Sequence, residues 1–145
     1  MTQTAGYTIE DLTVGMEATF AKTISDDDIE KFAQVSGDNN PVHLDDDYAK
    51  QTRFGGRIAH GMLSASLISA VIGTRLPGPG AIYMSQSLRF RAPVKPGDLA
   101  SAHVKISAID AAKKRVTLAC SVYVGDTLVV DGEAMVMVPS KGAAV

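Results

Sequence analysis

Apolar and polar positions divide the chain into an early part with helical spacing and a later part with strand spacing. A helix is predicted to begin after Ser25, because Ser25 is a good N-cap residue and Asp28 follows three positions later. Positions on one side of this helix recur every three or four residues: Ile29, Phe32, Ala33 and Ser36. Gly37 predicts its end. Residues 38–60 then form an irregular segment, with a short helical turn near residues 46–51.

A second helix is predicted over residues 61–76, where every side is apolar or small, and a helix of that kind is buried all round. The prolines and glycines of residues 77–80 end it. Alternating apolar residues predict strands at about residues 17–24, 82–90, 100–108, 116–124 and 128–138. Gly125-Asp126 is a two-residue link typical of a type II′ hairpin. Strands grouped beside a separate helix predict an α+β fold, in which a curved antiparallel sheet wraps around the central buried helix.

Composition narrows the class of protein. The chain has 145 residues, which predicts a single domain over residues 1–145 with a flexible tail at 139–145. Hydrophobic residues make up 46% and charged residues 21%, as in soluble globular proteins. The formal net charge of -2 gives no basic field for nucleic acid or anionic lipid, so we expect neither as a partner.

Other features of the composition point to the cytoplasm. The single cysteine, Cys120, excludes an internal disulfide and fits a reducing compartment. The first residues lack the basic and apolar runs of a secretory signal. The longest apolar stretch, around residues 62–72, is interrupted by serines and is too short to span a bilayer. We therefore expect a soluble cytoplasmic protein without a membrane partner.

One short turn carries the first candidate chemistry. Residues 37–43 read Gly-Asp-Asn-Asn-Pro-Val-His. Gly37 permits a sharp departure from the helix, and Pro41 fixes its own φ and extends Asn40. The turn thus carries a carboxylate, Asp38, and an imidazole, His43, that could reach one water molecule as an acid–base pair. The same residues are also good turn chemistry, with Asp38 capping amides and His43 an ordinary loop residue.

A second candidate feature lies where the second helix begins. The first amides of a helix have no helical partner and form an anion site. The amide of Gly61 could therefore bind a carbonyl oxygen that gains negative charge, although Gly61 could also serve packing alone. His60, just before it, could be a ligand, a cap or a core histidine.

Other chemistries find little support in the sequence. The three histidines and one cysteine show no metal-ligand spacing, so no metal is expected. The serines of the second helix, which include Ser69, are not in a nucleophile elbow. Four arginines could meet a phosphorylated substrate, and the sequence does not choose among them: Arg53, Arg57, Arg89 and Arg91.

Together these motifs resemble the MaoC-like (R)-specific enoyl-CoA hydratases, the hydratase 2 group of the hot-dog superfamily. The signature stretch runs from Phe32 to His43 as FAQVSGDNNPVH, followed by Ala49. Residues 59–63 (AHGML) and the turn at residues 92–98 also look like the family. The resemblance covers about residues 7–138, which would be the core of a single hot-dog domain.

The resemblance implies a function and roles for particular residues. The enzyme would add water to trans-2-enoyl-CoA and make (R)-3-hydroxyacyl-CoA, with Asp38 and His43 as the catalytic dyad. The Gly61 amide would hold the thioester carbonyl, Asn40 would orient the dyad, and Ser69 falls at the position of a helper serine. No cofactor would be needed, because coenzyme A is part of the substrate. The chain would resemble the compact homodimeric members.

Three other functions remain open at the level of sequence. A dehydratase acting on carrier-protein thioesters would run the same chemistry in reverse. A hot-dog thioesterase would cleave the thioester and release free thiol. A non-catalytic module would bind acyl-CoA, although a binder has no need for both Asp38 and His43. The chain-length preference, the direction of the reaction and its use in polyester synthesis or acyl-chain breakdown are not encoded in any motif that we find.

Overall fold

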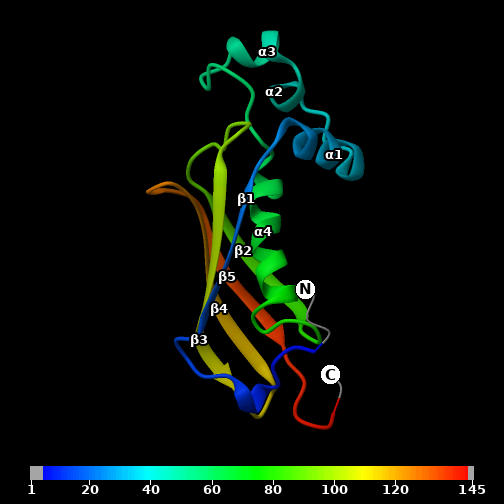
Figure 1. The fold of residues 1–145 in the computed structure, drawn as a ribbon, viewed down its shortest axis with the longest axis vertical. Coiled ribbons are helices and arrows are strands. Elements are labelled where there is room, and N and C mark those ends of the chain that lie inside the picture. The colour runs from blue at the N-terminus through cyan, green and yellow to red at the C-terminus, as the bar shows by residue number, and fades with distance from the viewer. Residues whose placement is uncertain (1–4, 144–145) are drawn as a thin grey trace.

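Five strands form one antiparallel sheet in the order β1-β3-β4-β5-β2, so that β1 and β2 are its edges (Figure 1). The structure is a computed structural model that describes residues 5–143. The strands are β1 (Glu17–Thr23), β2 (Ile82–Phe90), β3 (Leu99–Asp110), β4 (Arg115–Val124) and β5 (Thr127–Met137). The predicted strands lie within two residues of these bounds, and Gly125 has the positive φ, 58°, that the predicted hairpin requires.

The longest helix, α4, runs along one face of this sheet, and α1, α2 and α3 gather beyond its N-terminal end (Figure 1). The helices are η1 (Ile9–Asp11), α1 (Asp26–Ser36), α2 (Pro41–Leu44), α3 (Asp46–Lys50) and α4 (Gly61–Thr74). The predicted α+β arrangement of an antiparallel sheet around a helix is thus confirmed. No helix among residues 5–143 is both long enough and apolar enough to cross a membrane.

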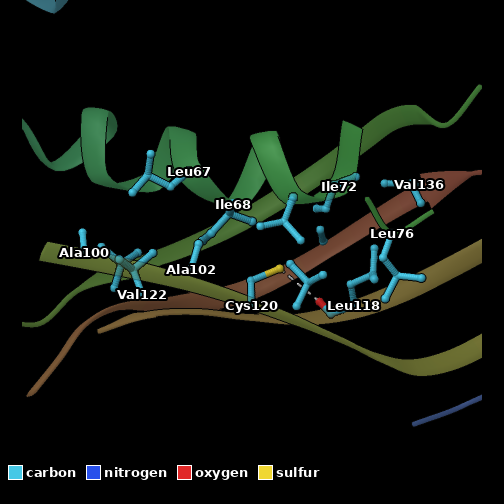
Figure 2. Close-up of a cluster of buried hydrophobic side chains, with 14 of the residues drawn as sticks. Leu67, Ile68, Ile72, Leu76, Ala100, Ala102, Leu118, Cys120, Val122 and Val136 are labelled. Carbon is cyan, nitrogen blue, oxygen red and sulfur yellow. Dashed lines mark hydrogen bonds between the residues drawn. The ribbon is translucent and has the colours of Figure 1, made fainter. Parts of the chain in front are cut away.

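The hydrophobic core lies between α4 and the sheet. Figure 2 shows Ile68 and Ile72 of α4 facing β3, β4 and β5, and both are almost completely buried. The facing strand residues are small or β-branched: Ala100, Ala102, Val122 and Val136. Cys120 also belongs to this core, where burial raises the pKa of its thiol to about 11 and keeps it protonated. Burying each large aliphatic side chain stabilises the fold by about 1.5–3 kcal/mol.

Helix α1 begins after Ser25 and ends at Gly37, as the sequence predicted. The Ser25 hydroxyl accepts a hydrogen bond from the Asp28 amide at 3.1 Å, and the Asp28 carboxylate accepts one from the Ser25 amide at 3.0 Å. Such a cap stabilises a helix by about 1 kcal/mol. Gly37 ends α1 in the left-handed region with φ 81°, which turns the chain sharply toward the next residues.

The prediction that the second helix is buried all round is wrong for the chain by itself. A stripe along α4 is exposed, because the sheet covers only the side of the helix that packs on β1, β3, β4 and β5. The exposed stripe consists of Met62, Ser66, Ser69 and Gly73. Strand β2 is similarly open, with Ile82, Met84 and Phe90 all more than 40% exposed.

The end of the chain is partly described. The Pro139 carbonyl accepts a hydrogen bond from the Ile9 amide at 2.9 Å, and the Lys141 amide donates to Glu10 at 2.8 Å. These contacts place residues 139–141 beside η1. Residues 144 and 145 of the predicted tail lie outside the described residues, and the tail's flexibility stays a prediction.

Candidate active site

The segment between α1 and α4 overhangs the N-terminal end of α4 (Figure 1). Arg57 ties this segment together, because its guanidinium lies 2.7 Å from Asp26 at the start of α1 and 2.7 Å from Asp46 at the start of α3. Its hydrogen bond to Asp46 is the main cause of a raised pKa for Arg57. Arg57 therefore joins the start of α1 to the start of α3.

The turn from Gly37 to His43 is held by short-range hydrogen bonds from its own side chains. Asp38 Oδ1 accepts from the Asn40 amide at 3.2 Å, and Asn40 Oδ1 accepts from the Val42 amide at 3.1 Å. Pro41 occupies the first turn of α2, where its missing amide costs nothing. The sequence predicted the stiff turn but not that Pro41–Leu44 would close into one turn of helix. Asn40 is thus the N-cap of α2, the helix that carries His43, and its predicted role in orienting the dyad stays a prediction.

His43 is buried, and its hydrogen bond defines its tautomer. Its Nδ1 lies 2.8 Å from the Ile58 carbonyl oxygen, which can only accept, so Nδ1 carries the proton. Nε2 is then left with a lone pair. Burial lowers the pKa of His43, although the Ile58 hydrogen bond and Asp38 act in the opposite direction. The ring is therefore neutral near pH 7 and able to accept a proton.

His60 lies against both members of the predicted dyad. Its ring stacks on His43 with centroids 3.8 Å apart and an interplanar angle of 27°. Its Nε2 lies 3.0 Å from the Asp38 carbonyl oxygen. One side-chain nitrogen or oxygen of each of Asp38, His43 and His60 lies within 4.8 Å of the other two. The structure thus brings the predicted dyad together and places His60 beside it. The sequence had left three roles open for His60: a ligand, a cap or a core histidine.

A cavity of about 430 Å³ opens beside this cluster. Asp38, His60 and Gly61 line it, and His43, which is not among the lining residues, stacks on the ring of His60. Most of its other lining residues come from the overhanging segment and from the chain around β2: Arg53, Phe54, Ile58, Ala59, Met62, Ser64, Phe90, Arg91, Ala92, Pro93, Val94 and Val130. Gly61 is the first residue of α4, so its amide has no helical acceptor and adjoins the cavity.

Asp38, His43 and His60 also form a group whose possible ligand atoms lie within 4.8 Å of one another, the spacing of a possible metal site. The sequence predicted no metal, and that absence stays a prediction.

Two other candidate groups differ in their relation to the cavity. Ser69, the predicted helper serine, lies on the exposed stripe of α4 and is not among the residues that line the cavity. Arg53 and Arg91 do line it, and Arg91 is held at 2.8 Å by Asp131. Arg53 has its guanidinium 5.2 Å from the Phe54 ring centroid. Of the four arginines that the sequence left open, Arg53 and Arg91 line the cavity, whereas Arg57 and Arg89 do not.

Comparison with known proteins identifies the family. The model of the MaoC-like domain family matches residues 11–125, which include the overhanging segment and α4. The chain belongs to the MaoC-like family. This confirms the resemblance read from the signature stretch and from residues 59–63.

Three similar proteins are named as hydratases or dehydratases. A protein of Rhodospirillum rubrum named (R)-specific enoyl-CoA hydratase is 54% identical over 133 residues, 92% of this chain and 92% of the relative. A protein of Methylorubrum extorquens named 3-hydroxybutyryl-CoA dehydratase is 52% identical over 135 residues, 93% of this chain and 86% of the relative. The unliganded R-hydratase structure from Pseudomonas aeruginosa superposes with a TM-score of 0.89 at 47% identity, over 94% of this chain and 88% of that one. The hot-dog fold expected from the sequence is thus confirmed.

Proposed function

We propose that this chain is a hydro-lyase that reversibly adds water to trans-2-enoyl-CoA and makes (R)-3-hydroxyacyl-CoA. The observation that carries the proposal is that side-chain atoms of Asp38 and of the neutral His43 ring lie within 4.8 Å of each other, beside a cavity that Asp38 and Gly61 line. The names of the two relatives, a hydratase and a dehydratase of CoA thioesters, describe the two directions of this reaction. The Asp38 and His43 assignment rests on the geometry and on the signature stretch.

The chemistry balances with one water molecule and no other reagent. His43 Nε2 takes a proton from the water while Asp38 accepts the hydrogen bond from its other hydrogen. The hydroxide adds to Cβ, and the electron pair of the double bond moves toward the thioester carbonyl. The Gly61 amide stabilises the negative charge on that oxygen. His43 then returns the proton to Cα, so that no cofactor beyond the coenzyme A of the substrate is required.

One assay tests the reaction class. Purified protein is incubated with crotonyl-CoA and longer enoyl-CoAs, while the conjugated enoyl absorbance and free thiol are followed together. Loss of absorbance without thiol release, with (R)-3-hydroxyacyl-CoA as the product, is the expected result. Thiol release would instead indicate a thioesterase, and no change of substrate would indicate a binding module. Turnover of carrier-protein thioesters alone would reassign the substrate.

The lowered pKa of His43 predicts the pH dependence of the reaction. Protonation removes the lone pair of Nε2, so kcat/KM should be constant near neutral pH and should fall only below the ordinary histidine value of 6.5. The unfolded chain binds this proton at higher pH than the folded chain, so stability should also decrease as pH falls below 6.5. A pH–rate profile measures the first effect, and an acid limb centred above 6.5 would contradict it.

We also propose that the chain forms a homodimer through the β2 edge. Edge strands invite pairing, and β1 protects its edge with Glu17 and Lys22. The β2 edge has no charged residue before Arg89 and exposes large apolar side chains instead, among them Ile82 and Met84. Pairing of β2 with its copy would be isologous and would place the exposed stripe of α4 near the boundary between subunits.

Matched substitutions at the two sheet edges test the dimer. Ile82→Lys at the β2 edge should convert the dimer to a monomer, because it places a charge at a desolvated apolar contact. Ala21→Lys, the same new side chain on exposed β1, should remain dimeric. Light scattering at micromolar concentration measures both masses. A wild-type monomer with full activity, or a dimer that survives Ile82→Lys and dissociates with Ala21→Lys, contradicts the proposed interface.

We propose a cytoplasmic location as well, which is supported by the single buried, reduced Cys120.

A further inference from the structure

His60 is a buried polar side chain beside the cavity, with 2% of its surface exposed. It stands at the N-cap of α4, but its side chain makes no capping hydrogen bond there. Capping therefore does not explain a histidine at this position. Its backbone carbonyl accepts from the amides of Leu63 and Ser64 and begins α4, while its side chain points to other partners.

The His60 ring contacts three separate elements of the overhanging region. Its Nε2 donates to the Asp38 carbonyl oxygen at 3.0 Å, since a carbonyl can only accept. Its face stacks on His43 of α2 at 3.8 Å. The Phe32 ring of α1 lies 4.9 Å away at 54°. One side chain thus spans α1, the turn that carries Asp38, and α2, and its own backbone leads into the Gly61 amide.

Apolar packing alone does not account for a histidine at this position. His60 Nδ1 is buried and has no hydrogen-bond partner among residues 5–143. A buried polar atom without a partner destabilises a protein by about 1–3 kcal/mol. A phenylalanine would fill a similar space without that penalty, and a glutamine could donate to Asp38 but has no flat ring. An imidazole, unlike these two side chains, combines an N–H donor with a stacking face.

We propose that His60 is a positioning residue, which fixes the Asp38 main chain and the His43 ring relative to each other and to the Gly61 amide. It acts through these residues and takes no proton itself. This inference rests on the proposed hydratase function, because the geometry that it maintains matters only if Asp38 and His43 share a water. Displacement of a catalytic group by about 1 Å can lower the rate about 10²-fold.

The first test measures the tautomers directly and needs no activity. Nitrogen-15 NMR of the histidine rings in the free protein at pH 7.5 should show His60 protonated at Nε2 and His43 protonated at Nδ1. Assignments come from comparing the spectra of wild type and His60→Phe. A His60 proton on Nδ1 would overturn the proposal, because Nε2 could not then donate to Asp38.

The second test separates positioning from stability. His60→Phe keeps a stacking ring and removes the donor, whereas His60→Gln keeps a donor and removes the ring. We expect both variants to keep KM for crotonyl-CoA within about 3-fold and to lose about 10²-fold in kcat. Leu118→Val, a change in the buried core far from the cavity, is the control for lowered stability. If Leu118→Val lowers the melting temperature as much as the His60 variants do, it should still retain wild-type kcat.

The third test is a double-mutant cycle. If His60 acts through Asp38, adding His60→Phe to Asp38→Asn should lower kcat by less than about 3-fold further. Multiplication of the two single effects would overturn the proposal, as would wild-type kcat in folded His60→Phe or His60→Gln. If wild-type protein does not hydrate any enoyl-CoA, the proposed function fails instead, and the NMR result still decides the His60 geometry.

Discussion

Asp38→Asn and His43→Gln should each lower the hydration rate by about 10²–10⁴-fold, the usual contribution of a general acid–base group. Both variants should fold. An asparagine at 38 retains the side-chain oxygen that accepts from the Asn40 amide, and a glutamine at 43 can donate to the Ile58 carbonyl. Steady-state kinetics with crotonyl-CoA, beside circular dichroism and thermal melting, measures both effects.

The double variant distinguishes a cooperating pair from two independent groups. Asp38 and His43 are expected to share one water, so removing the second group should add little to the loss caused by the first. Turnover close to that of wild type in either single variant, with its fold intact, would exclude the pair as the catalytic dyad. A double variant that loses the product of both single effects would show that the two groups act at separate steps.

Gly61→Pro should slow hydration by about 10²–10³-fold, or roughly 3–4 kcal/mol in transition-state stabilisation, because it removes one oxyanion donor. The backbone accommodates proline at this position. Gly61 begins α4, does not have a positive φ, and follows His60 with φ -59° and ψ 136°, which is the extended conformation favoured before proline. Substrate binding should weaken much less than turnover, since the charge develops in the transition state.

Gly61→Ala is the control, and the structure shows what it controls for. A Cβ at Gly61 would lie 2.7 Å from Phe90 Cδ1, so alanine and proline both require the exposed Phe90 ring to move. Repeating the pair in a Phe90→Ala background removes this crowding from both. In that background the alanine variant should be at least about 10-fold faster than the proline variant. Equal rates would exclude the Gly61 amide as the donor.

Where an element could be predicted, the signal was local. The capping box at Ser25, the glycine at 37 and the alternation in β3 and β4 each act within a few residues, and each appears in the structure as expected. The exposure of α4 and β2 was not predictable in this way. Apolar residues in a helix indicate that it will be covered, but they do not say whether the cover is the chain's own sheet or a second copy.

Local sequence signals predicted even less of the site, because part of it depends on contacts between distant residues. Asp38 and His43 lie within one turn, so their spacing along the chain is enough to suggest a pair. His60 lies 17 positions after His43, and its stacking depends on how the overhanging segment returns to α4. The one sequence signal for His60 is its position directly before Gly61. That position does not distinguish a histidine that caps α4 from one whose ring contacts the dyad. The exposure of Ser69 depends likewise on which face of α4 the sheet covers.

The first turn of α4 contains no acidic residue, whereas the first turn of α1 contains three. An acid such as Met62→Glu would stabilise α4 by about 0.3–1 kcal/mol through the helix dipole. It would also place a negative charge at the rim of the cavity, next to the amide that is proposed to meet a developing oxyanion. The absence of an acid at the N-terminus of α4 therefore trades stability of the helix for activity of the site. Selection for thermostability alone would be expected to enrich acidic residues there and to lower turnover.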